Sequence, residues 1–197
     1  MFRRLVFIII ILICFWWLPL AVRAAAIDSD SDGLSDDLES KFKTDINNSD
    51  TDGDGYADGL EIKNGYDPLQ GDGAKLTKGI VVNLKKQQLT YYLSDVAMGV
   101  FPVSTGKATM PTPKGTFQVA NKSVKAWSRT YKLWMPYWLG IKGQAFGIHE
   151  LPIWPSGKKE GEKDLGHPVS HGCIRLGAGP AKIIYDFATV GTKVIVE

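Results

Sequence analysis

The stretch Ser170-His171-Gly172-Cys173-Ile174-Arg175, together with Gly147-Ile148-His149 upstream, decides how this chain is interpreted. The chain has two cysteines, and Cys14 lies in an apolar amino-terminal run, so Cys173 is the one thiol of the remainder. A single cysteine outside the cytoplasm has no internal disulfide partner and is a buried filler, an intermolecular partner or a nucleophile. Cys173 directly follows a glycine and stands two residues after a histidine, which favours the nucleophile.

A cysteine nucleophile needs a nearby base. The thiolate is the attacking form, and a neighbouring imidazole lowers the thiol pKa from about 8.5 to about 3.5–7.5. His149, His167 and His171 are the three histidines of the chain. Sequence spacing alone does not choose the base among them.

The negative oxygen that develops during acyl transfer needs hydrogen-bond donors. The backbone N–H groups of Gly172 and Cys173 fill this role if the loop turns sharply, which glycine permits. Ser170 is expected to fix the loop by hydrogen bonding. Arg175 has a planar fork that either grips a substrate carboxylate or braces the cleft.

These residues resemble the signature of the L,D-transpeptidase (YkuD-type) catalytic domain. The motif Ser-His-Gly-Cys-Ile-Arg is preceded by Gly-Ile-His and by Leu165-Gly166, and segments 103–107 and 111–117 are similar to the strand and turn before the family's core. The resemblance covers residues 78–197. It implies a mainly β fold, a β-sandwich-like mixed sheet with few short helices and an active site in a cleft.

The resemblance also implies an activity and a role for each residue. The expected enzyme acts on peptidoglycan: Cys173 attacks a stem peptide after its third residue, at the bond to the terminal D-residue, and a neighbouring stem's amine resolves the acyl-enzyme. His149 is the implied base, with its ring oriented by the backbone carbonyl of Glu150. His171 is implied as a conformational and hydrogen-bonding residue of the cleft. Carbapenems are expected to acylate the same thiol, and catalysis needs no cofactor.

Two features depart from the family pattern. Glu150 replaces the small residue often found after the first histidine. Twenty residues separate His149 from Ser170, slightly more than the family leads one to expect. The extra length, residues 154–164, is predicted to be a polar surface loop that shapes substrate entry.

The charge of the chain is divided between two parts. Residues 27–72 hold 14 acidic residues against 3 lysines, a net charge of −11, whereas residues 73–197 have a net charge of +10. Such asymmetry indicates two modules with different partners. The acidic part suits cations, and the basic part suits cell-wall polyanions. Nucleic acid is disfavoured, because the lysines are scattered singly and no nucleic-acid motif accompanies them.

The amino terminus is typical of a secretory signal peptide. A short basic head precedes an apolar run and then small residues with an A-x-A spacing within residues 1–26. The run of about 16 apolar residues is shorter than the ~20 that span a bilayer, which favours cleavage over retention as a membrane anchor. Either outcome places the remainder outside the cytoplasm, in the cell wall, the periplasm or the medium.

Residues 28–69 contain an internal repeat with a period of 22. Each copy places oxygen donors at loop positions 1, 3, 5, 9 and 12, a backbone carbonyl at position 7 and glycine at position 6, which is the ligand pattern for Ca²⁺. The alternative is a solvated acidic linker, which gains nothing from two copies in register. The predicted ligands are Asp28, Asp30, Asp32, Leu34, Asp36 and Glu39 in the first loop, and Asp50, Asp52, Asp54, Tyr56, Asp58 and Glu61 in the second.

The loops resemble thrombospondin type 3 repeats, with a dockerin-like pair as the alternative. A helix is predicted after each loop, over residues 37–42 and 59–64, but none before it, which argues against a true EF-hand. So many carboxylates with so little apolar residue do not pack unaided, so the module is predicted to be ordered by the metal. Sites of this kind bind Ca²⁺ with a Kd of about 10⁻⁴–10⁻³ M.

A boundary at residues 71–73 separates the repeats from a part with period-two patterning. The aromatic-rich segment 122–142 is predicted to serve core and lid packing, with a cleft lining as the alternative. The predicted elements are a hairpin over 80–84 and 89–93, strands over 100–104 and 116–120, a helix over 180–190 that Gly191 ends, and a last strand over 193–196.

The sequence thus predicts a signal peptide or anchor (residues 1–26), a calcium-binding repeat module (27–72) and an L,D-transpeptidase catalytic domain (78–197). Two alternatives remain at this stage. One is an L,D-carboxypeptidase or endopeptidase of the same fold, in which water resolves the acyl-enzyme. The other is a calcium-dependent wall-binding module without activity, against which the intact Cys-His set argues.

Overall fold

The structure is a computed structural model that describes residues 26–142 and 145–197. Cys14 and almost all of the expected leader therefore lie outside the described residues. Among the helices of the described ranges, none has both the length and the apolar character needed to cross a bilayer.

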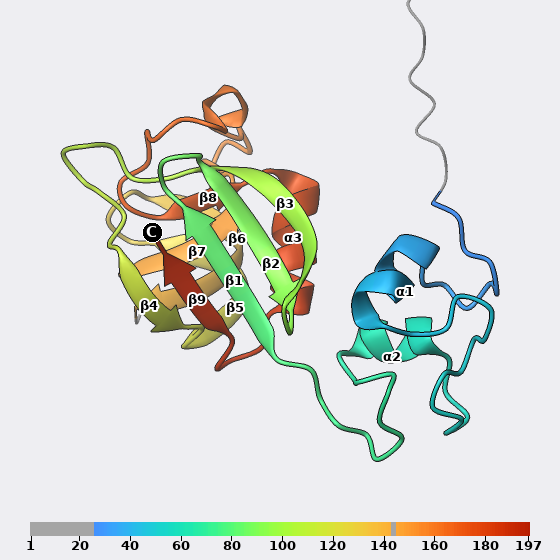
Figure 1. Ribbon diagram of the computed structural model, residues 1–197. Helices are drawn as coiled ribbons and strands as arrows, with labels where there is room; N and C mark the ends of the chain where they lie inside the picture. The colour runs from blue at the N-terminus through green and yellow to red at the C-terminus, as the bar shows by residue number, and fades with distance from the viewer. Residues whose placement is uncertain (1–25, 143–144) are drawn as a thin grey trace, which may run out of the picture.

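One mixed sheet of nine strands is the centre of the carboxy-terminal part of the described chain (Figure 1), in the order β4-β9-β1-β2-β3-β8-β7-β6-β5. Only β1·β9 and β7·β8 pair in parallel; the other neighbours are antiparallel. Strand β4, at one edge, contacts β6 near the other edge, so the sheet curls on itself. The strands are β1 (Lys78–Asn83), β2 (Gln88–Leu93), β3 (Val96–Ser104), β4 (Gly115–Gln118), β5 (Asn121–Ser128), β6 (Leu133–Lys142), β7 (Phe146–Glu150), β8 (Ile174–Leu176) and β9 (Lys193–Val196).

Alternating apolar residues build the core of this sheet. Ile80 and Val82 of β1 are buried, and so are Val194 and Val196 of β9, because side chains of a strand point alternately to its two faces. Helix α3 (Ala178–Phe187) packs on β6, β7 and β8. The mainly β mixed-sheet fold predicted from the sequence is confirmed, as are the first hairpin and the last strand.

Two segments differ from the sequence-based expectation. Helix α3 covers residues 178–187 rather than 180–190, because Thr189 turns away with its N–H donated to the Thr192 hydroxyl (2.9 Å). Gly191, with φ +93°, belongs to this turn instead of ending the helix directly. The aromatic-rich segment forms the long β5–β6 hairpin, which the sequence did not reveal as strands.

The end of α3 is held by a side chain from the far edge of the sheet. The ammonium of Lys122, on β5, donates to the carbonyl oxygens of Tyr185 (2.6 Å) and Ala188 and lies 4.3 Å from the centre of the Tyr185 ring. Carbonyls in the last turn of a helix lack intrahelical partners, and a cation there also complements the helix dipole. Lys122 therefore ties α3 to β5.

The acidic repeats form a small module with two short helices, α1 (Asp36–Phe42) and α2 (Asp58–Asn64), which start 22 residues apart. Each ends on a left-handed residue, Lys43 (φ +68°) or Gly65 (φ +81°). The predicted helix after each loop is confirmed, and residues 44–57, which lead into the second helix, contain no helix; the segment before the first loop lies almost wholly outside the described residues. The 22-residue repeat of the sequence is therefore also a repeat of the structure, one loop followed by one helix.

Replacing Lys122 by methionine should destabilise the sheet part by about 2 kcal/mol, because the stem remains but two charge-assisted hydrogen bonds to helix carbonyls are lost. The free energy of unfolding in urea measures this loss. Lys85→Met, at an exposed position in the β1–β2 turn, is the matched control and should change the value little. Equal effects of the two substitutions would contradict the capping role.

Candidate functional site

Cys173 opens into a pocket of about 440 Å³ on the sheet part. Strand β7 supplies His149, the bend directly before β8 supplies Cys173, β8 itself supplies Arg175, and β6 supplies Trp138. The full lining is Ser128, Thr130, Tyr131, Leu133, Met135, Trp138, Ala145, Phe146, His149, Pro152, Trp154, Glu160, His171, Cys173 and Arg175.

The parallel pairing of β7 with β8 sets the relative position of these groups. In its register Ile148 lies opposite Ile174, and His149 lies opposite Arg175. The two halves of the motif, whose paired residues are 26 positions apart along the chain, therefore become neighbours in the sheet. Ile148 and Ile174 are fully buried and anchor the pair in the core.

The ring of His149 is buried and oriented by the main chain. Its Nδ1 lies 2.5 Å from the carbonyl oxygen of Glu150, so Nδ1 carries the proton and Nε2 is left as the acceptor. Burial lowers the pKa of His149 to about 4, against the opposing effect of the Glu150 hydrogen bond and together with the nearby Arg175 charge. The imidazole is therefore neutral at physiological pH.

The thiol of Cys173 is also kept neutral. Burial raises its pKa, and the smaller effects of a backbone hydrogen bond from Gly147 and of the Arg175 charge lower it. Removal from water disfavours the charged form of both groups. The sequence-based expectation of a thiol pKa lowered by an imidazole is not what the geometry gives. Both shifts favour a neutral thiol and a neutral imidazole in the pocket.

The loop before Cys173 is held by Ser170, which is fully buried. Its hydroxyl donates to the Cys173 carbonyl (2.6 Å) and accepts the Gly172 N–H (3.1 Å). Thr112 donates its hydroxyl to the Gly172 carbonyl (2.8 Å). Ser170 thus fixes the loop as expected. The Gly172 N–H is engaged by Ser170, however, which corrects the expectation that it serves the oxyanion and leaves the Cys173 N–H as the loop's donor.

The other two histidines lie in different surroundings. His171 lines the pocket, and its ring packs against Tyr131, with ring centres 4.7 Å apart. Its pKa is lowered by burial and by the charges of Lys107 and Arg175. Its expected hydrogen bond is not seen among the described residues. His167 is exposed and does not line the pocket.

Arg175 is a buried residue of the pocket lining and lies beside the predicted entry loop. Its Nη1 lies 3.9 Å from Oε1 of Glu160, whose other oxygen accepts the Trp154 indole N–H (2.7 Å). Both partners come from the segment 154–164, so the extra length does line the pocket. Glu150, the other departure from the family pattern, is buried and paired with Lys159 at 2.7 Å, which neutralises its charge.

The aromatic hairpin also contributes to the cleft. Tyr131 in its turn and Trp138 on β6 line the pocket, and Trp138 packs against His149 with ring centres 5.9 Å apart. Trp127 and Trp134 instead lie tilted against each other, with ring centres 4.8 Å apart, outside the pocket lining. Tyr137 packs against the buried core of the sheet, so the segment contributes to core packing as well as to the cleft.

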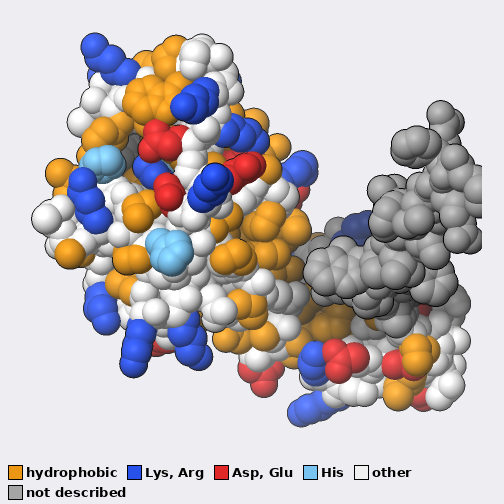
Figure 2. Space-filling model, turned by 90° about the horizontal axis from the view of Figure 1, so that it is seen from above, with side chains coloured by type: hydrophobic (Ala, Val, Ile, Leu, Met, Phe, Trp, Pro, Cys, Tyr) orange, Lys and Arg blue, Asp and Glu red, His pale blue; other side chains and the backbone are white. Residues whose placement is uncertain are grey.

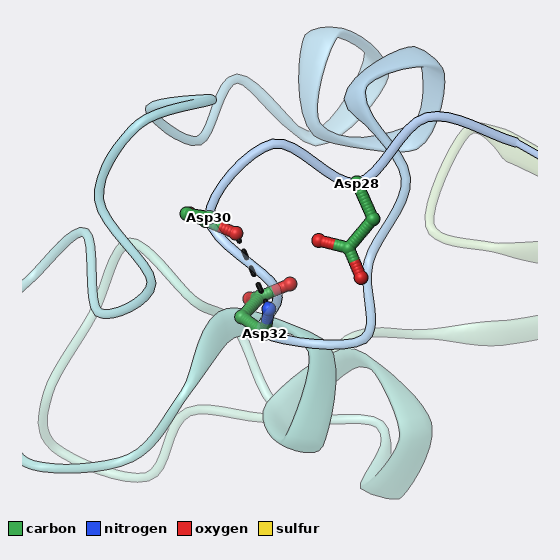
Figure 3. Close-up of side chains that lie close together, drawn as sticks. All are labelled: Asp28, Asp30 and Asp32. Carbon is green, nitrogen blue, oxygen red and sulfur yellow. Dashed lines mark hydrogen bonds between the residues drawn. The ribbon is translucent and has the colours of Figure 1, made fainter.

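A second group of functional side chains lies in the repeat module. The carboxylates of Asp28, Asp30 and Asp32 point into the curl of the first loop (Figure 3), with ligand oxygens within 4.8 Å of one another. The carboxylates at the same positions of the second loop, residues 50, 52 and 54, meet the same limit. Asp28 accepts the Gly33 N–H (3.1 Å) just as Asp50 accepts the Gly55 N–H (2.9 Å). The two loops share one geometry.

A buried glutamate accompanies each cluster. Glu39 and Glu61 each have an oxygen that is buried without a hydrogen-bond partner within the described structure, and so have Asp28, Asp30 and Asp52. Burial, followed by repulsion from the neighbouring aspartates, raises the pKa of Glu39 to about 6 and that of Glu61 to about 7. Buried carboxylate oxygens are costly unless paired or bound to a cation. Carboxylates and a loop carbonyl fit Ca²⁺.

The carboxylates at loop position 9 accept hydrogen bonds from the second residue of the same loop. Asp36 accepts the N–H (2.9 Å) and hydroxyl (2.8 Å) of Ser29, and Asp58 accepts the same groups of Thr51 (2.9 and 2.5 Å). Neither belongs to the three-carboxylate clusters. These hydrogen bonds close each loop, at a position that often reaches calcium through water, and the prediction that Asp36 and Asp58 are calcium ligands stays a prediction.

The curled sheet and the Cys173–His149 pocket define a catalytic domain for acyl transfer through a cysteine. A sequence model of the L,D-transpeptidase catalytic domain matches residues 77–196. The chain belongs to this YkuD family of L,D-transpeptidase catalytic domains. The repeat module lies outside the match.

Individual relatives agree with this assignment. The chain is 28% identical over 145 residues to YqjB of Bacillus subtilis, named as an L,D-transpeptidase, and covers 75% of it with 67% of its own length. YciB of the same species is 33% identical over 126 residues, with 60% of this chain covering 64% of that protein. An L,D-transpeptidase structure from Mycobacterium smegmatis is 26% identical in sequence, with a TM-score of 0.55. The match covers 64% of this chain and 60% of that chain. An L,D-transpeptidase structure from Stackebrandtia nassauensis is 28% identical in sequence, with a TM-score of 0.53. The match covers 63% of this chain and 57% of that chain.

The low pKa of His149 predicts the pH dependence of thiol acylation. The rate of acylation by a carbapenem should change little between pH ~7.5 and ~6 and fall as the pH drops through about 4, because only the neutral ring accepts the thiol proton. Stopped-flow absorbance across this range measures it. A fall centred between pH 6 and 7 would contradict the buried, neutral ring.

Gly172→Ala should damage the cysteine loop. Gly172 has φ +110°, and a Cβ there would lie 2.5 Å from the Phe146 ring, so the substitution adds a collision to about 1–3 kcal/mol of backbone strain. Acylation should slow sharply, and the thermal midpoint should fall. Gly166→Ala is the control, since φ is +91° but a Cβ meets no atom within 4 Å. Equal losses in the two variants would rule out a special role of the Phe146 contact.

Proposed function

We propose that this protein is an exported cysteine L,D-transpeptidase that cross-links or remodels peptidoglycan through an acyl-enzyme on Cys173. The observation that carries the proposal is the shared pocket in which Cys173 lies with His149, whose Nδ1 is held by the Glu150 carbonyl. The family match supplies the reaction class.

In the first half-reaction the thiol attacks the carbonyl carbon after the third residue of a stem peptide. The S–C bond forms as the thiol proton passes to Nε2 of His149, and the Cys173 N–H stabilises the oxyanion. The C–N bond to the terminal D-residue then breaks, and the proton on His149 goes to the leaving amine. A thioester remains on Cys173.

In the second half-reaction an amine from a neighbouring stem attacks the thioester. His149 accepts a proton from this amine, the new amide forms, and the proton returns to the departing sulfur. The aromatic lining of Tyr131, Trp138 and Trp154 limits access of water, which would otherwise give only a shortened stem. Arg175 either holds a substrate carboxylate or braces the pocket through Glu160.

The peptidoglycan substrate puts the working site outside the cytoplasm, in line with the signal peptide or anchor predicted for residues 1–26. Cell-wall polyanions are proposed as neighbours of the basic part. On the face of the sheet part that Figure 2 shows, Lys and Arg side chains are spread out rather than gathered in one patch. Such a surface favours loose attraction to a polyanionic wall over a defined nucleic-acid site.

The repeat module (residues 27–72) is proposed as a calcium-binding unit similar to thrombospondin type 3 repeats, separate from the catalytic domain (78–197). In each loop the aspartates at positions 1, 3 and 5, the carbonyl at position 7 and the buried glutamate would hold the ion. The support is the set of buried, unpartnered carboxylate oxygens. Calcium neutralises these charges and orders the loops; it takes no part in acyl transfer.

Intact-protein mass after incubation with a carbapenem tests the enzymatic proposal. The protein should gain the mass of one acyl group, and Cys173→Ala should gain none while keeping its far-ultraviolet dichroism. With peptidoglycan fragments, new cross-linked products identify a transpeptidase, whereas shortened stems alone identify a carboxypeptidase. An unmodified native protein would refute the proposed nucleophile.

Titration with calcium tests the module. At about 10 mM Ca²⁺ and a Kd near 10⁻⁴ M, one site adds about 2.7 kcal/mol to the stability of the folded module. Calorimetry should show two bound ions, and chelation should lower the thermal midpoint. The double variant Asp30→Asn, Asp52→Asn, which removes one carboxylate charge per cluster, should lose most of both effects. Absence of binding at millimolar calcium in the native chain would remove the proposal.

A further inference from the structure

The repeat module is joined to the catalytic domain by a buried apolar seam. Leu34, Phe42 and Ile62 of the module form one cluster with Leu93 and Val96, which flank the β2–β3 turn. All five are buried. None of the ion pairs within the described chain crosses between the two parts. The contact is therefore apolar although the two parts carry opposite net charge.

Phe187 continues this seam into the catalytic core. This last residue of α3 packs against the seam cluster and also against the core cluster of the sheet. Its ring meets that of Tyr91 on β2 edge-on, with centres 4.9 Å apart. Apolar contact thus runs without a break from the module to the helix that packs on β7.

Leu34 links the seam to the first calcium loop. Its N–H donates to Oδ1 of Asp32 (2.6 Å), its carbonyl stands at loop position 7, and its side chain is only 3% exposed, within the seam. Tyr56 occupies the same position in the second loop, with the equivalent bond to Asp54 (2.9 Å), yet its side chain is 60% exposed. The two loops match in local geometry and differ in what their seventh residue contacts.

The first loop also supports the second. Oδ2 of Asp32 accepts the N–H of Gly59, in the first turn of α2, at 2.7 Å. A Cβ on Gly59 would lie 2.6 Å from the Asp32 carbonyl oxygen, so α2 rests directly on the first loop. The first loop therefore supports the second loop's helix, which itself contributes Ile62 to the seam.

We propose that calcium in the first loop fixes this seam. The metal thereby stabilises the β2–β3 turn and the end of α3 in the catalytic domain. The second loop has no direct contact with that surface through its seventh residue. The inference rests on the proposed calcium function. Without a cation the carboxylates of the first loop and buried Glu39 repel one another, and the loop that positions Leu34 loosens. A bound cation holds the Leu34 carbonyl and thereby its side chain.

Peptide-resolved hydrogen exchange on the full-length protein tests the proposal. Going from chelated to 10 mM Ca²⁺ should slow exchange over residues 88–104 and 178–192. In Leu34→Ala, which keeps the carbonyl and every carboxylate, this protection should shrink by at least about tenfold, because a buried leucine contributes that much or more. Tyr56→Ala is the matched control and should keep the native protection.

A variant on the catalytic side keeps the test independent of the loop's own folding. Val96→Ala leaves both calcium loops unchanged, and it should reduce the protection and also weaken calcium binding to the first loop, because coupling between sites is reciprocal. Calorimetry on the same samples separates the two ideas. No calcium uptake by the native protein defeats the calcium function itself. Calcium uptake without protection of residues 88–104, or equal behaviour of the Leu34, Val96 and Tyr56 variants, would falsify the seam proposal alone.

Discussion

The parallel pairing of β7 with β8 is the constraint on which the active site depends. Parallel neighbours need a long crossover connection, since the chain must return to the same end of the sheet. Here the crossover is the segment between Glu150 and Ile174, and it carries Trp154, Glu160 and His171 into the pocket. The connection that the pairing requires is thus the same segment that builds much of the pocket wall and presents the nucleophile.

Burial favours the neutral protonation state of both the Cys173 thiol and the His149 ring. Removal from water raises the pKa of Cys173 and lowers that of His149, so both effects favour the neutral pair. A neutral thiol is a weak nucleophile and is also less prone to oxidation, which follows thiolate character and exposure. Activation is then coupled to the arrival of a carbonyl, whose developing charge is met by donors already in place. The held loop at Ser170 supplies that preorganisation at no cost during the reaction.

Local patterns predicted the parts of the structure that depend on local chemistry. The hairpin of β1 and β2, strand β9 and the two loop-helix repeats follow from period-two alternation and from a 22-residue repeat. Features made by distant residues could not be predicted. The β5–β6 hairpin lacks clean alternation, and the early end of α3 accompanies a cap by Lys122, 66 residues from Ala188. Within the active-site loop, the N–H of Gly172 was assigned to the oxyanion by position, whereas the Ser170 hydroxyl accepts it.

The contact between the repeat module and the catalytic domain gives the two copies of the repeat different surroundings. Opposite net charges draw an acidic module toward a basic domain over a Debye length of about 8 Å, but screened attraction does not select one docking geometry. Selection here comes from apolar shape, because Leu34 meets a matching surface at Leu93 and Val96. Tyr56, in a loop of the same backbone, faces solvent. Two loops with one ligand pattern therefore differ in what their seventh side chain contacts, the catalytic domain in the first loop and solvent in the second.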